Sequence, residues 1–378
     1  MGHQKLTIAV SLADYCFERT RTIGQMNLAI GLVKALATRP EIEKLVVLKN
    51  NTIQFDFHQE NLVFIDCNQA IKNKISRIFW DQIGLYSVVK KLGVQWLILP
   101  KGFASFVRRP PSRLAVYIHD AVPDFYRTHY PKDYNRLEQI YFNSAMRASL
   151  KFSDMVFPNS EFVVGEVKRL CENWKIKPEY QMCKLGVAFE KPTEVSATKS
   201  GRLLVLVSKW RHKRSNLAIE FLKKWQQQTG FNKGIDFVGE LPDGIAFPQF
   251  PQWRHYPRLP EKEYRELFTS SSALVYFSEY EGFGMPPVEA AINGVCPVYS
   301  DIPALREVMV GCGFSFNNSS YEDFSYALNS ALNMPYEQIK LWEDKLLKLH
   351  NWQDRADKFI SALTNVKRIN EPELKGIN

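Results

Sequence analysis

Glu281 and Glu289 lie on either side of a segment rich in glycine and proline, Gly282 to Pro287. An apolar run, Ala273 to Phe277, precedes them, so the order strand, glycine loop, helix is predicted. In a parallel α/β sheet, ligands bind at the carboxyl ends of the strands. Glycine backbone and a helix N-terminus favour a phosphate, whereas two acids favour hydroxyl groups. Phosphate together with hydroxyls predicts a nucleotide sugar as the ligand.

The position of Glu289 in its helix decides whether both acids can face one ligand. If Pro286 or Pro287 opens the helix, Glu289 lies in the first turn, beside the glycine loop. The alternative is that Glu289 only favours the positive end of its own helix and that Glu281 is an ordinary loop acid.

Several cations follow a second apolar run, Leu203 to Val207, in the segment Ser208 to Ser215. Cations packed into one β-to-α loop repel one another, which an anion among them would relieve. Lys213 and Arg211 are therefore predicted to neutralise a diphosphate leaving group. A solvated basic turn is the alternative.

Two positions in the first half of the chain follow predicted strands in the same way. His119, directly after the run Leu114 to Ile118, could hydrogen-bond a substrate hydroxyl or assist proton transfer, with Asp120 orienting it. Gly24, in the first β-to-α turn, could approach a diphosphate or an acceptor. The alternatives are a helix-capping Asp120 with a packed His119, and a glycine that only starts a helix.

Composition limits the classes of protein to consider. With 378 residues, 45% hydrophobic and 24% charged, the chain is predicted to form two globular domains. The formal charge of +9 indicates a partner of opposite sign, but no basic stripe with interleaved aromatics is present, so nucleic acid is not expected. Neither a signal peptide nor an apolar run of about 18 residues is found, which favours a cytoplasmic protein.

Missing motifs narrow the chemistry further. The chain has no Asp-x-Asp, so no metal ion is expected to hold the diphosphate, and the six scattered cysteines lack zinc-site spacing. The phosphate loop of NTPases, the dinucleotide-binding glycine motif and the nucleophile elbow of hydrolases are also missing.

Apolar runs alternate with helical periodicity along the whole chain, which predicts an α/β protein with two doubly wound parallel sheets, a linker over Val187 to Gly201 and a cleft between the halves. The predicted strands are Thr7 to Leu12, Lys44 to Leu48, Trp96 to Leu99, Leu114 to Ile118, Met155 to Phe157, Leu203 to Val207, Ile235 to Val238 and the two around Ala273 to Ser300. The predicted helices include Gly24 to Ala37, Trp80 to Leu92, Asp133 to Leu150, Glu161 to Leu170, Ser215 to Gln228, Glu261 to Phe268, Tyr321 to Leu332, Tyr336 to Lys348 and Trp352 to Leu363.

The segment Glu281 to Glu289 closely resembles the Glu-x7-Glu motif of a large family of retaining GT-B glycosyltransferases, family 4 or group 1, which includes enzymes of bacterial surface polysaccharides. Further landmarks appear in family order: Trp80-Asp-Gln82, Tyr117-Ile-His-Asp120, Pro158-Asn-Ser-Glu161, Leu185-Gly186 and Ser300 to Glu307. The resemblance implies two Rossmann-like domains facing across a cleft. Residues 1–187 would form the acceptor domain and 188–351 the donor domain, with a C-terminal helix, about 352–378, packing back on the first.

The resemblance also implies roles for individual residues. Glu281 would contact the donor sugar, Glu289 the ribose, and His119 the sugar from the first domain, while Lys213 and a nearby cation hold the diphosphate. The family often has Gly-Arg or Gly-Thr where this chain has Ser208-Lys209, so Arg211 or Lys209 remains open as the second cation. The other implied donor contacts are Gly24, Ser208, Phe283, Gly284 and Met285.

The function implied is a retaining, metal-independent hexosyltransferase without a cofactor. It would move mannose, rhamnose, glucose or galactose from a nucleotide diphosphate sugar to a glycan or lipid-diphosphate acceptor in lipopolysaccharide or polysaccharide synthesis. The basic balance suits an anionic membrane surface at the inner face of the membrane, and other glycosyltransferases are conceivable partners. The alternatives are a non-catalytic sugar-binding subunit, or an epimerase or phosphorylase on the same fold.

Overall fold

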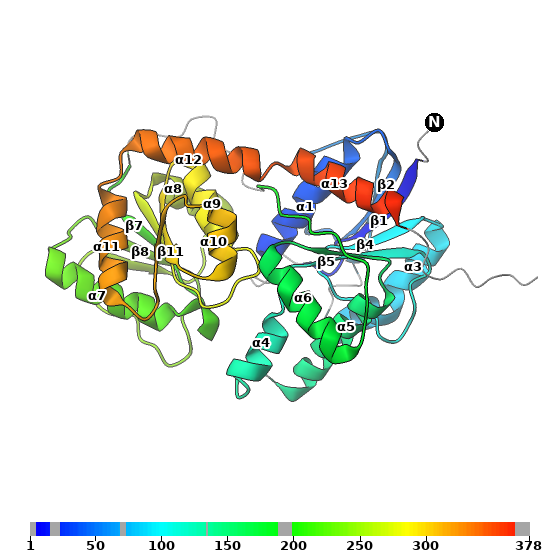
Figure 1. The fold of residues 1–378 in the computed structure, drawn as a ribbon, viewed down its shortest axis with the longest axis horizontal. Helices are drawn as coiled ribbons and strands as arrows, with labels where there is room; N and C mark the ends of the chain where they lie inside the picture. Colours follow the sequence, from blue (N-terminus) through cyan, green and yellow to red (C-terminus); the bar gives the residue numbers. More distant parts are fainter. Residues whose placement is uncertain (1–4, 16–22, 69–72, 134, 188–198, 367–378) are drawn as a thin grey trace, which may run out of the picture. The chain divides into compact units, whose positions relative to one another are not determined.

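The computed structural model describes residues 5–15, 23–68, 73–133, 135–187 and 199–366. The chain divides into two compact units. Unit 1 is Met1–Ala188 with Asn351–Asn378, and unit 2 is Phe189–His350 (Figure 1). Most of the predicted linker, residues 188–198, lies outside the described residues.

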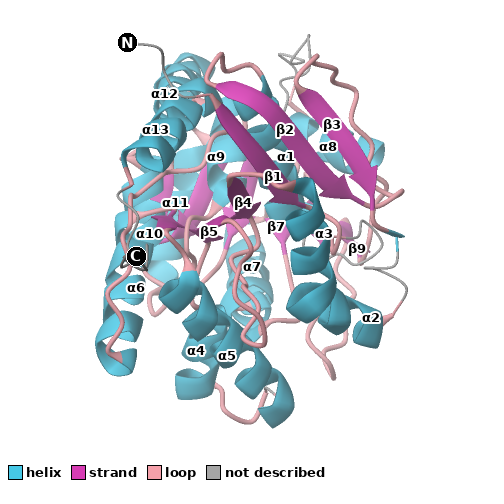
Figure 2. Ribbon diagram, turned by 90° about the vertical axis from the view of Figure 1, so that its right-hand side faces the viewer, coloured by secondary structure: helices cyan, strands magenta, loops and turns pink. Residues whose placement is uncertain are grey.

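Unit 1 is built on a parallel sheet with the strand order β3-β2-β1-β4-β5-β6. Figure 2 shows β1, β2 and β3 side by side. The strands are β1 (Leu6–Ser11), β2 (Ile42–Lys49), β3 (Leu62–Asp66), β4 (Trp96–Leu99), β5 (Arg113–Ile118) and β6 (Met155–Pro158). Strands buried on both faces read as continuous apolar runs, which is why the central strands were predictable.

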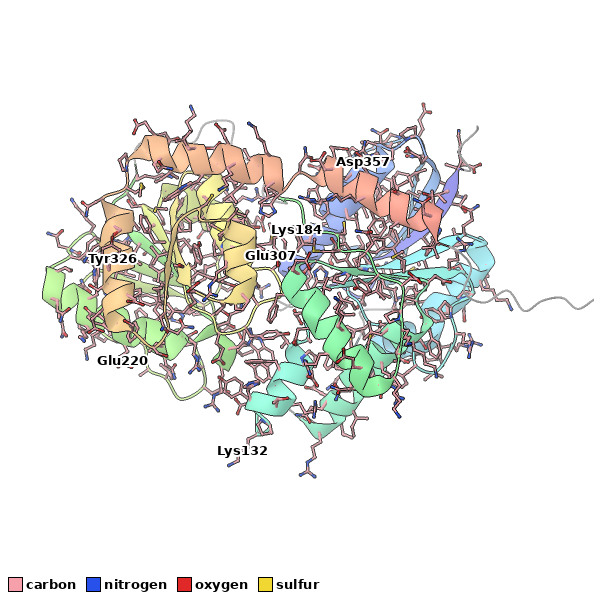
Figure 3. The ribbon with its side chains drawn as sticks, viewed as in Figure 1. Lys132, Lys184, Glu220, Glu307, Tyr326 and Asp357 are labelled. Atoms are coloured by element: carbon pink, nitrogen blue, oxygen red, sulfur yellow. The ribbon has the colours of Figure 1, made fainter. Side chains whose placement is uncertain are left out.

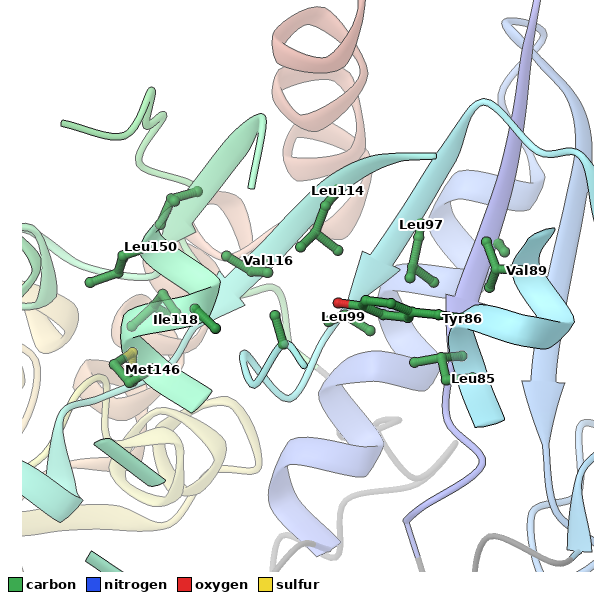
Figure 4. Close-up of a cluster of buried hydrophobic side chains, with 14 of the residues drawn as sticks. Leu85, Tyr86, Val89, Leu97, Leu99, Leu114, Val116, Ile118, Met146 and Leu150 are labelled. Carbon is green, nitrogen blue, oxygen red and sulfur yellow. The ribbon is translucent and has the colours of Figure 1, made fainter. Parts of the chain in front are cut away.

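Helices cover both faces of this sheet. The described helices of unit 1 are α1 (Ile23–Ala37), α2 (Lys74–Phe79), α3 (Leu85–Leu92), α4 (Val122–His129), α5 (Arg136–Phe152), α6 (Glu161–Trp174) and α13 (Trp352–Asn365). One face carries the apolar cluster of Figure 4, in which Leu85 and Tyr86 of α3 and Met146 of α5 pack with strand residues. On the other face, Phe359 of α13 stacks on Phe157 of β6, with ring centroids 4.0 Å apart.

Trp352, the first residue of α13, occupies a space that two glycines leave open. A Cβ atom at Gly31 of α1 would lie 2.5 Å from the Nε1 atom of Trp352, and one at Gly186 would lie 2.3 Å from its Cγ atom. Side chains at either position would displace the indole ring, so these glycines let α13 pack against the rest of unit 1.

Unit 2 repeats the architecture with the strand order β12-β11-β10-β7-β8-β9, again parallel. Its strands are β7 (Leu203–Leu206), β8 (Ile235–Val238), β9 (Trp253–Tyr256), β10 (Ala273–Tyr276), β11 (Cys296–Ser300) and β12 (Phe314–Phe316). Its described helices are α7 (Ser215–Thr229), α8 (Glu261–Ser270), α9 (Met285–Ile292), α10 (Pro303–Met309), α11 (Tyr321–Leu332) and α12 (Tyr336–Leu349).

An aromatic core fixes α7 and α11 on one face of the second sheet. Phe277, after β10, lies 4.6 Å from Phe316 of β12 and 5.3 Å from Phe324 of α11, measured between ring centroids. Charged side chains such as Glu220 of α7 lie on the outer faces of the helices (Figure 3). The strand order places the ends of β7 and β10 next to each other, which brings two of the predicted site loops together.

The structure differs from the sequence prediction at several elements. The strands β3, β9 and β12 and the helices α2, α4 and α10 were not predicted, and the predicted single helix from Trp80 to Leu92 is a π-helical turn, Trp80–Gly84, followed by α3. The edge strands β9 and β12 are short and part-exposed and lack a continuous apolar run. The edge strand β3 does contain an apolar run, Leu62 to Ile65, which the prediction overlooked.

Two further findings concern membranes and cysteines. No described helix is both long enough and apolar enough to span a bilayer. The five described cysteines are buried and carry free thiols. Burial raises the pKa of the Cys296 thiol to about 12, so this thiol stays protonated and unreactive at neutral pH.

Candidate active site

A short basic loop joins β7 to α7 in unit 2. Its two ends are fastened by Ser215, whose Oγ atom accepts the N–H of Ser208 at 2.8 Å and donates to the carbonyl of Ser208 at 2.7 Å. Between them, Arg211–Lys213 forms one 3₁₀ turn, and Arg214 takes the left-handed conformation with φ of 49°. This tight turn fixes the direction in which the side chain of Lys213 points.

Lys213 meets Glu281 and Tyr276 in a three-membered polar cluster. The Nζ atom of Lys213 forms an ion pair with Oε1 of Glu281 and lies 2.7 Å from the hydroxyl of Tyr276. That hydroxyl in turn donates to Oε1 of Glu281 at 2.7 Å. Tyr276 is the last residue of β10, so the cluster joins the carboxyl ends of β7 and β10.

The charges in this cluster depend on one another. Burial would raise the pKa of Glu281, but the Lys213 charge, the nearby His212 and the hydrogen bonds from Lys213 and Tyr276 together lower it. Burial and the Lys213 charge lower the pKa of His212 to about 4, so the histidine is neutral at neutral pH. Lys213 and Glu281 therefore form a charged pair, with side chains 22% and 12% exposed.

Buried hydrogen bonds hold the segment that leads to Glu281. The Ser278 N–H donates to Oγ of Ser300 at 2.9 Å, and Nδ2 of Asn318 donates to the Ser278 carbonyl at 2.8 Å. The Glu279 N–H donates to the carbonyl of His212 at 2.8 Å. The loops after β7, β10 and β12 and the last residue of β11 are thus joined around one position, which limits the freedom of Glu281.

The glycine loop ends at Gly284, which precedes α9 with φ of +87°. A Cβ atom there would lie 2.1 Å from Cδ2 of Leu305, so only glycine fits. Phe283 is buried, with its ring edge-on to His350, and Met285 is the first residue of the helix. No side chain caps this N-terminus, but Pro286 and Pro287 carry no N–H, so the N–H of Met285 is what the first three residues of the helix can offer to an anion.

Glu289 lies in the second turn of α9, not in the first. The prediction assumed that Pro286 or Pro287 opens the helix, whereas the helix begins at Met285. Burial and the nearby Glu261 raise the pKa of Glu289 to about 7, although Arg265 opposes them. Both Glu281 and Glu289 help to raise the pKa of Tyr276, together with its burial, so the two acids lie within electrostatic reach of one hydroxyl.

The remaining cations of the basic loop differ in their partners. Lys209 forms an ion pair with Glu240 at 2.6 Å between Nζ and Oε2, and Arg214 pairs with Glu279. Arg211 is exposed at the start of the 3₁₀ turn that carries Lys213. Which of Lys209 and Arg211 acts as the second cation therefore stays a prediction.

His119 in unit 1 is held by a backbone carbonyl. Its Nε2 atom lies 2.6 Å from the carbonyl oxygen of Pro100, which can only accept a hydrogen bond, so Nε2 carries the proton and Nδ1 keeps a lone pair. Burial lowers the pKa of His119 to about 4, so the ring is neutral. Asp120 accepts the N–H of Val122 at 3.0 Å, the helix-start role given above as an alternative, and Pro100 orients His119.

Gly24 lies in the first turn of α1 and is exposed, and a Cβ atom there would meet nothing within 4 Å. Nothing in the local packing therefore requires glycine at this position. The predicted contacts of Gly24 and His119 with the residues of unit 2 stay predictions.

Sequence reasoning missed Tyr276 and the buried scaffold of Ser278, Ser300 and Asn318. Tyr276 ends an apolar run and reads as a core residue, and no local pattern marks a hydroxyl placed between Lys213 and Glu281. Among the residues that the structure describes, no group of three or more His, Cys, Asp or Glu side chains could hold a metal ion.

Comparison with known proteins identifies the fold. Sucrose-phosphate synthase from Thermosynechococcus elongatus superimposes with a TM-score of 0.67 at 14% identity, covering 95% of this chain and 98% of that chain. The catalytic domain of starch synthase IV from Arabidopsis thaliana, bound to ADP and acarbose, gives a TM-score of 0.66 at 13% identity, covering 95% and 99%. The chain therefore has the GT-B fold of glycosyltransferases.

Sequence similarity adds a family match that covers part of unit 2 and continues into the C-terminal part of unit 1. Residues 251–367 match the model of the family described as glycosyl transferases group 1. The O-antigen chain mannosyltransferase of Salmonella typhimurium is 23% identical over 256 residues, which cover 64% of this chain and 65% of that protein. The chain thus matches just under two thirds of the length of this curated relative.

Proposed function

We propose that this protein is a retaining, metal-independent hexosyltransferase that uses a nucleotide diphosphate sugar. The observation that carries the proposal is the cluster of Lys213, Tyr276 and Glu281 beside the uncapped N-terminus of α9. It sets a cation, a carboxylate and a backbone N–H at one edge of a parallel sheet, where α/β proteins bind nucleotides.

Sugar transfer from a diphosphate develops two opposite charges. The bond between the anomeric carbon and the phosphate oxygen breaks, so the diphosphate gains negative charge while the sugar becomes oxocarbenium-like. Lys213, Arg211 and the backbone N–H of Met285 stabilise the diphosphate, and the Glu281 carboxylate stabilises the sugar. Glu289 accepts hydrogen bonds from the ribose hydroxyls.

The anomeric configuration is retained if the diphosphate departs from, and the acceptor oxygen attacks, the same face of the sugar. The acceptor oxygen then bonds to the anomeric carbon as the phosphate leaves, and a phosphate oxygen takes the acceptor proton. His119, neutral and with a lone pair on Nδ1, accepts a hydrogen bond from a sugar hydroxyl rather than acting as a cationic acid.

Mannose is the first donor sugar to test. The relative from Salmonella typhimurium is named for transferring mannose in the O-antigen chain, and the starch synthase neighbour binds ADP. By analogy, the donor here is a nucleotide-linked hexose of the mannose, rhamnose, glucose or galactose type. The acceptor is a growing glycan, or a glycan on a lipid diphosphate, in polysaccharide synthesis.

Exposed apolar side chains on unit 1 support a lipid-linked acceptor. Ile75 of α2 and Leu137 of α5 are 79% and 76% exposed, and the two helices adjoin through an ion pair of Lys74 with Glu138 at 2.9 Å. Apolar side chains beside cations suit the interface of an anionic membrane. Vesicle cosedimentation at low salt checks this: equal recovery on neutral and anionic vesicles would contradict charge-driven association.

Lys213→Ala tests the proposed leaving-group site. A panel of UDP-, GDP- and dTDP-sugars in a thermal-shift assay first selects the donor, because a ligand of the folded state raises its apparent stability. With that donor, loss of one preorganised cation is expected to remove about 2–4 kcal/mol of transition-state stabilisation. This corresponds to a decrease in kcat/KM of roughly 30- to 1,000-fold. The matched control is Lys262→Ala, whose side chain is 88% exposed on α8.

Product analysis separates transfer from other chemistries. Free nucleotide together with a glycosylated acceptor supports the proposal. An epimerised sugar nucleotide, sugar phosphate release, or binding without turnover would each assign another class of protein. Full turnover with an unchanged KM in Lys213→Ala would show that the leaving group lies elsewhere.

A further inference from the structure

A second polar cluster lies in unit 1, beyond the carboxyl ends of β1 and β4. Asp14 follows β1, Lys101 follows β4, Asp81 comes from the π-helical turn, and Tyr141 comes from α5. Lys101 forms an ion pair with Asp14, and the hydroxyl of Tyr141 donates to Oδ2 of Asp81 at 3.1 Å. Both Asp14 and Lys101 act electrostatically on Asp81, which places all four side chains together.

The backbone around Asp81 departs from regular helix. The π-helical turn Trp80–Gly84 interrupts the run from α2 to α3, and such turns are rare and often found at functional sites. Gln82 fixes its position: Nε2 donates to the hydroxyl of Tyr141 at 3.4 Å, and Oε1 accepts the N–H of Phe106 at 3.0 Å. The turn therefore aligns Asp81 and Gln82 on the same tyrosine hydroxyl.

Two polar atoms in this region lack partners. Oδ1 of Asp81 has no hydrogen-bond partner among the described residues, and its side chain is only half-buried. The hydroxyl of Tyr15 is fully buried and also without a partner. Tyr15 adjoins the cluster, because the Nζ atom of Lys101 lies 5.6 Å from its ring centroid and the charge of Asp14 raises its pKa after burial.

The charge balance indicates what kind of ligand fits. The carboxylates of Asp14 and Asp81 are balanced by the charges of Lys101 and Arg77, so the cluster has no excess charge that would attract an anion such as phosphate. Burial and the Asp14 charge raise the pKa of Asp81 to about 7, while Lys101, Tyr141 and Arg77 of α2 oppose them. A half-buried acid beside another acid is repelled by it, so stabilising the fold does not explain why Asp81 lies beside Asp14. A neutral ligand that donates and accepts hydrogen bonds suits it better.

We propose that Asp81, Tyr141 and Lys101 form a binding site for the hydroxyl groups of a sugar residue in the acceptor. Oδ1 of Asp81 accepts from one hydroxyl, and Lys101 donates to a neighbouring one. Phe106, 41% exposed and with its ring 5.7 Å from that of Tyr141, supplies an apolar surface for the C–H face of the sugar. The assignment as an acceptor site rests on the proposed function, whereas sugar binding itself can be measured independently.

Saturation-transfer NMR on the full chain tests the binding. The probes are the methyl glycosides of mannose, glucose, galactose and rhamnose at high millimolar concentration, with saturating UDP and GDP present to occupy the donor site of unit 2. At least one glycoside is expected to bind, and Asp81→Asn should weaken it by about 10- to 100-fold, as for loss of a charged hydrogen bond. Asp56→Asn, at a side chain 80% exposed, is the matched control and should leave binding unchanged.

Tyr141→Phe provides a second variant, because it removes one oxygen and keeps the ring that packs against Phe106. It should also weaken binding. In the wild type, affinity should rise between pH 6 and pH 8 as Asp81 ionises, and this rise should vanish in Asp81→Asn. Unchanged binding in both variants, no binding by any glycoside, or preference for an amino sugar over its hydroxyl counterpart would each overturn the proposal.

The two proposals fail in distinguishable ways. If Lys213→Ala keeps full donor turnover, the leaving-group site is wrong but sugar binding at Asp81 stands. If transfer is confirmed, Asp81→Asn should raise the KM for the acceptor and leave acceptor-free donor hydrolysis unchanged. A loss of donor hydrolysis in Asp81→Asn would instead assign Asp81 to the donor site.

Discussion

Replacing Lys213 by methionine should reveal how strongly Glu281 depends on its partner. The two side chains are 22% and 12% exposed, so the substitution leaves a nearly buried carboxylate without its cation. Breaking a buried pair in this way costs about 3–5 kcal/mol of stability. Because Tyr276 still donates to Glu281, we expect the lower end, about 3 kcal/mol, at neutral pH.

The loss should depend on pH in a defined direction. In the wild type, burial opposes ionisation of Glu281, but Lys213 outweighs it and lowers the pKa, so the pair stabilises above the unfolded pKa of about 4.3 and this contribution is lost as pH falls. Without Lys213, burial raises the pKa of Glu281. The loss of stability caused by the unpaired Glu281 carboxylate is then fully present above that raised pKa and disappears as pH falls through it. The difference between variant and wild type should therefore shrink from pH 7.5 to pH 5.

Urea denaturation followed by tryptophan fluorescence measures these differences. The double variant Lys213→Met with Glu281→Gln removes both charges and should recover most of the lost stability, because no unpaired carboxylate remains. It should not recover donor turnover. Equal destabilisation at both pH values, or no recovery in the double variant, would refute the account of Glu281 as a carboxylate held ionised by Lys213.

Three further outcomes are expected. Gly284→Ala should lower stability by about 1–3 kcal/mol in thermal unfolding, because φ is +87° and a Cβ atom would clash with Leu305, whereas Gly24→Ala should be neutral or slightly stabilising. Nucleotide affinity, measured by calorimetry, should rise from pH 6 to pH 8 as Glu289, with a pKa of about 7, becomes a carboxylate, and Glu289→Gln should flatten this profile. Stability conferred by Asp81 is lost as pH rises through its pKa of about 7. In urea denaturation at pH 8, the free energy of unfolding of Asp81→Asn should therefore exceed that of the wild type by about 1–2 kcal/mol.

The fold was predictable where burial dominates the sequence pattern. The strand Trp96–Leu99 is covered on both faces, and its apolar run matches the observed bounds. The bounds of Ile235–Val238 also match the prediction, although Asp236 interrupts its apolar residues. The π-helical turn at Trp80–Gly84 was not predictable, because its apolar spacing resembles that of a continuous helix. Its insertion is decided by long-range hydrogen bonds from Gln82, which no local pattern contains.

The candidate site was predictable in part for the same reason. Glycines, acids and cations in loops after strands are visible as departures from the apolar pattern, so Glu281 and Lys213 were found. Their direct pairing, and that of Lys209 with Glu240, depends on distances between loops far apart in the sequence. Tyr276 was missed because a tyrosine at the end of a strand is ordinary in a core, and only the structure places its hydroxyl between two charges.

Trp352 packs between Gly31 and Gly186, and this contact affects the order in which the chain can fold during synthesis. Unit 2 is one continuous stretch, so it can complete its core as soon as it leaves the ribosome. Unit 1 begins before unit 2 but lacks α13 until unit 2 has been synthesised, and its sheet face around Phe157 lacks the ring of Phe359 until then. The unit that is made first is therefore finished last, and the nascent chain must carry an exposed apolar surface while unit 2 is being synthesised.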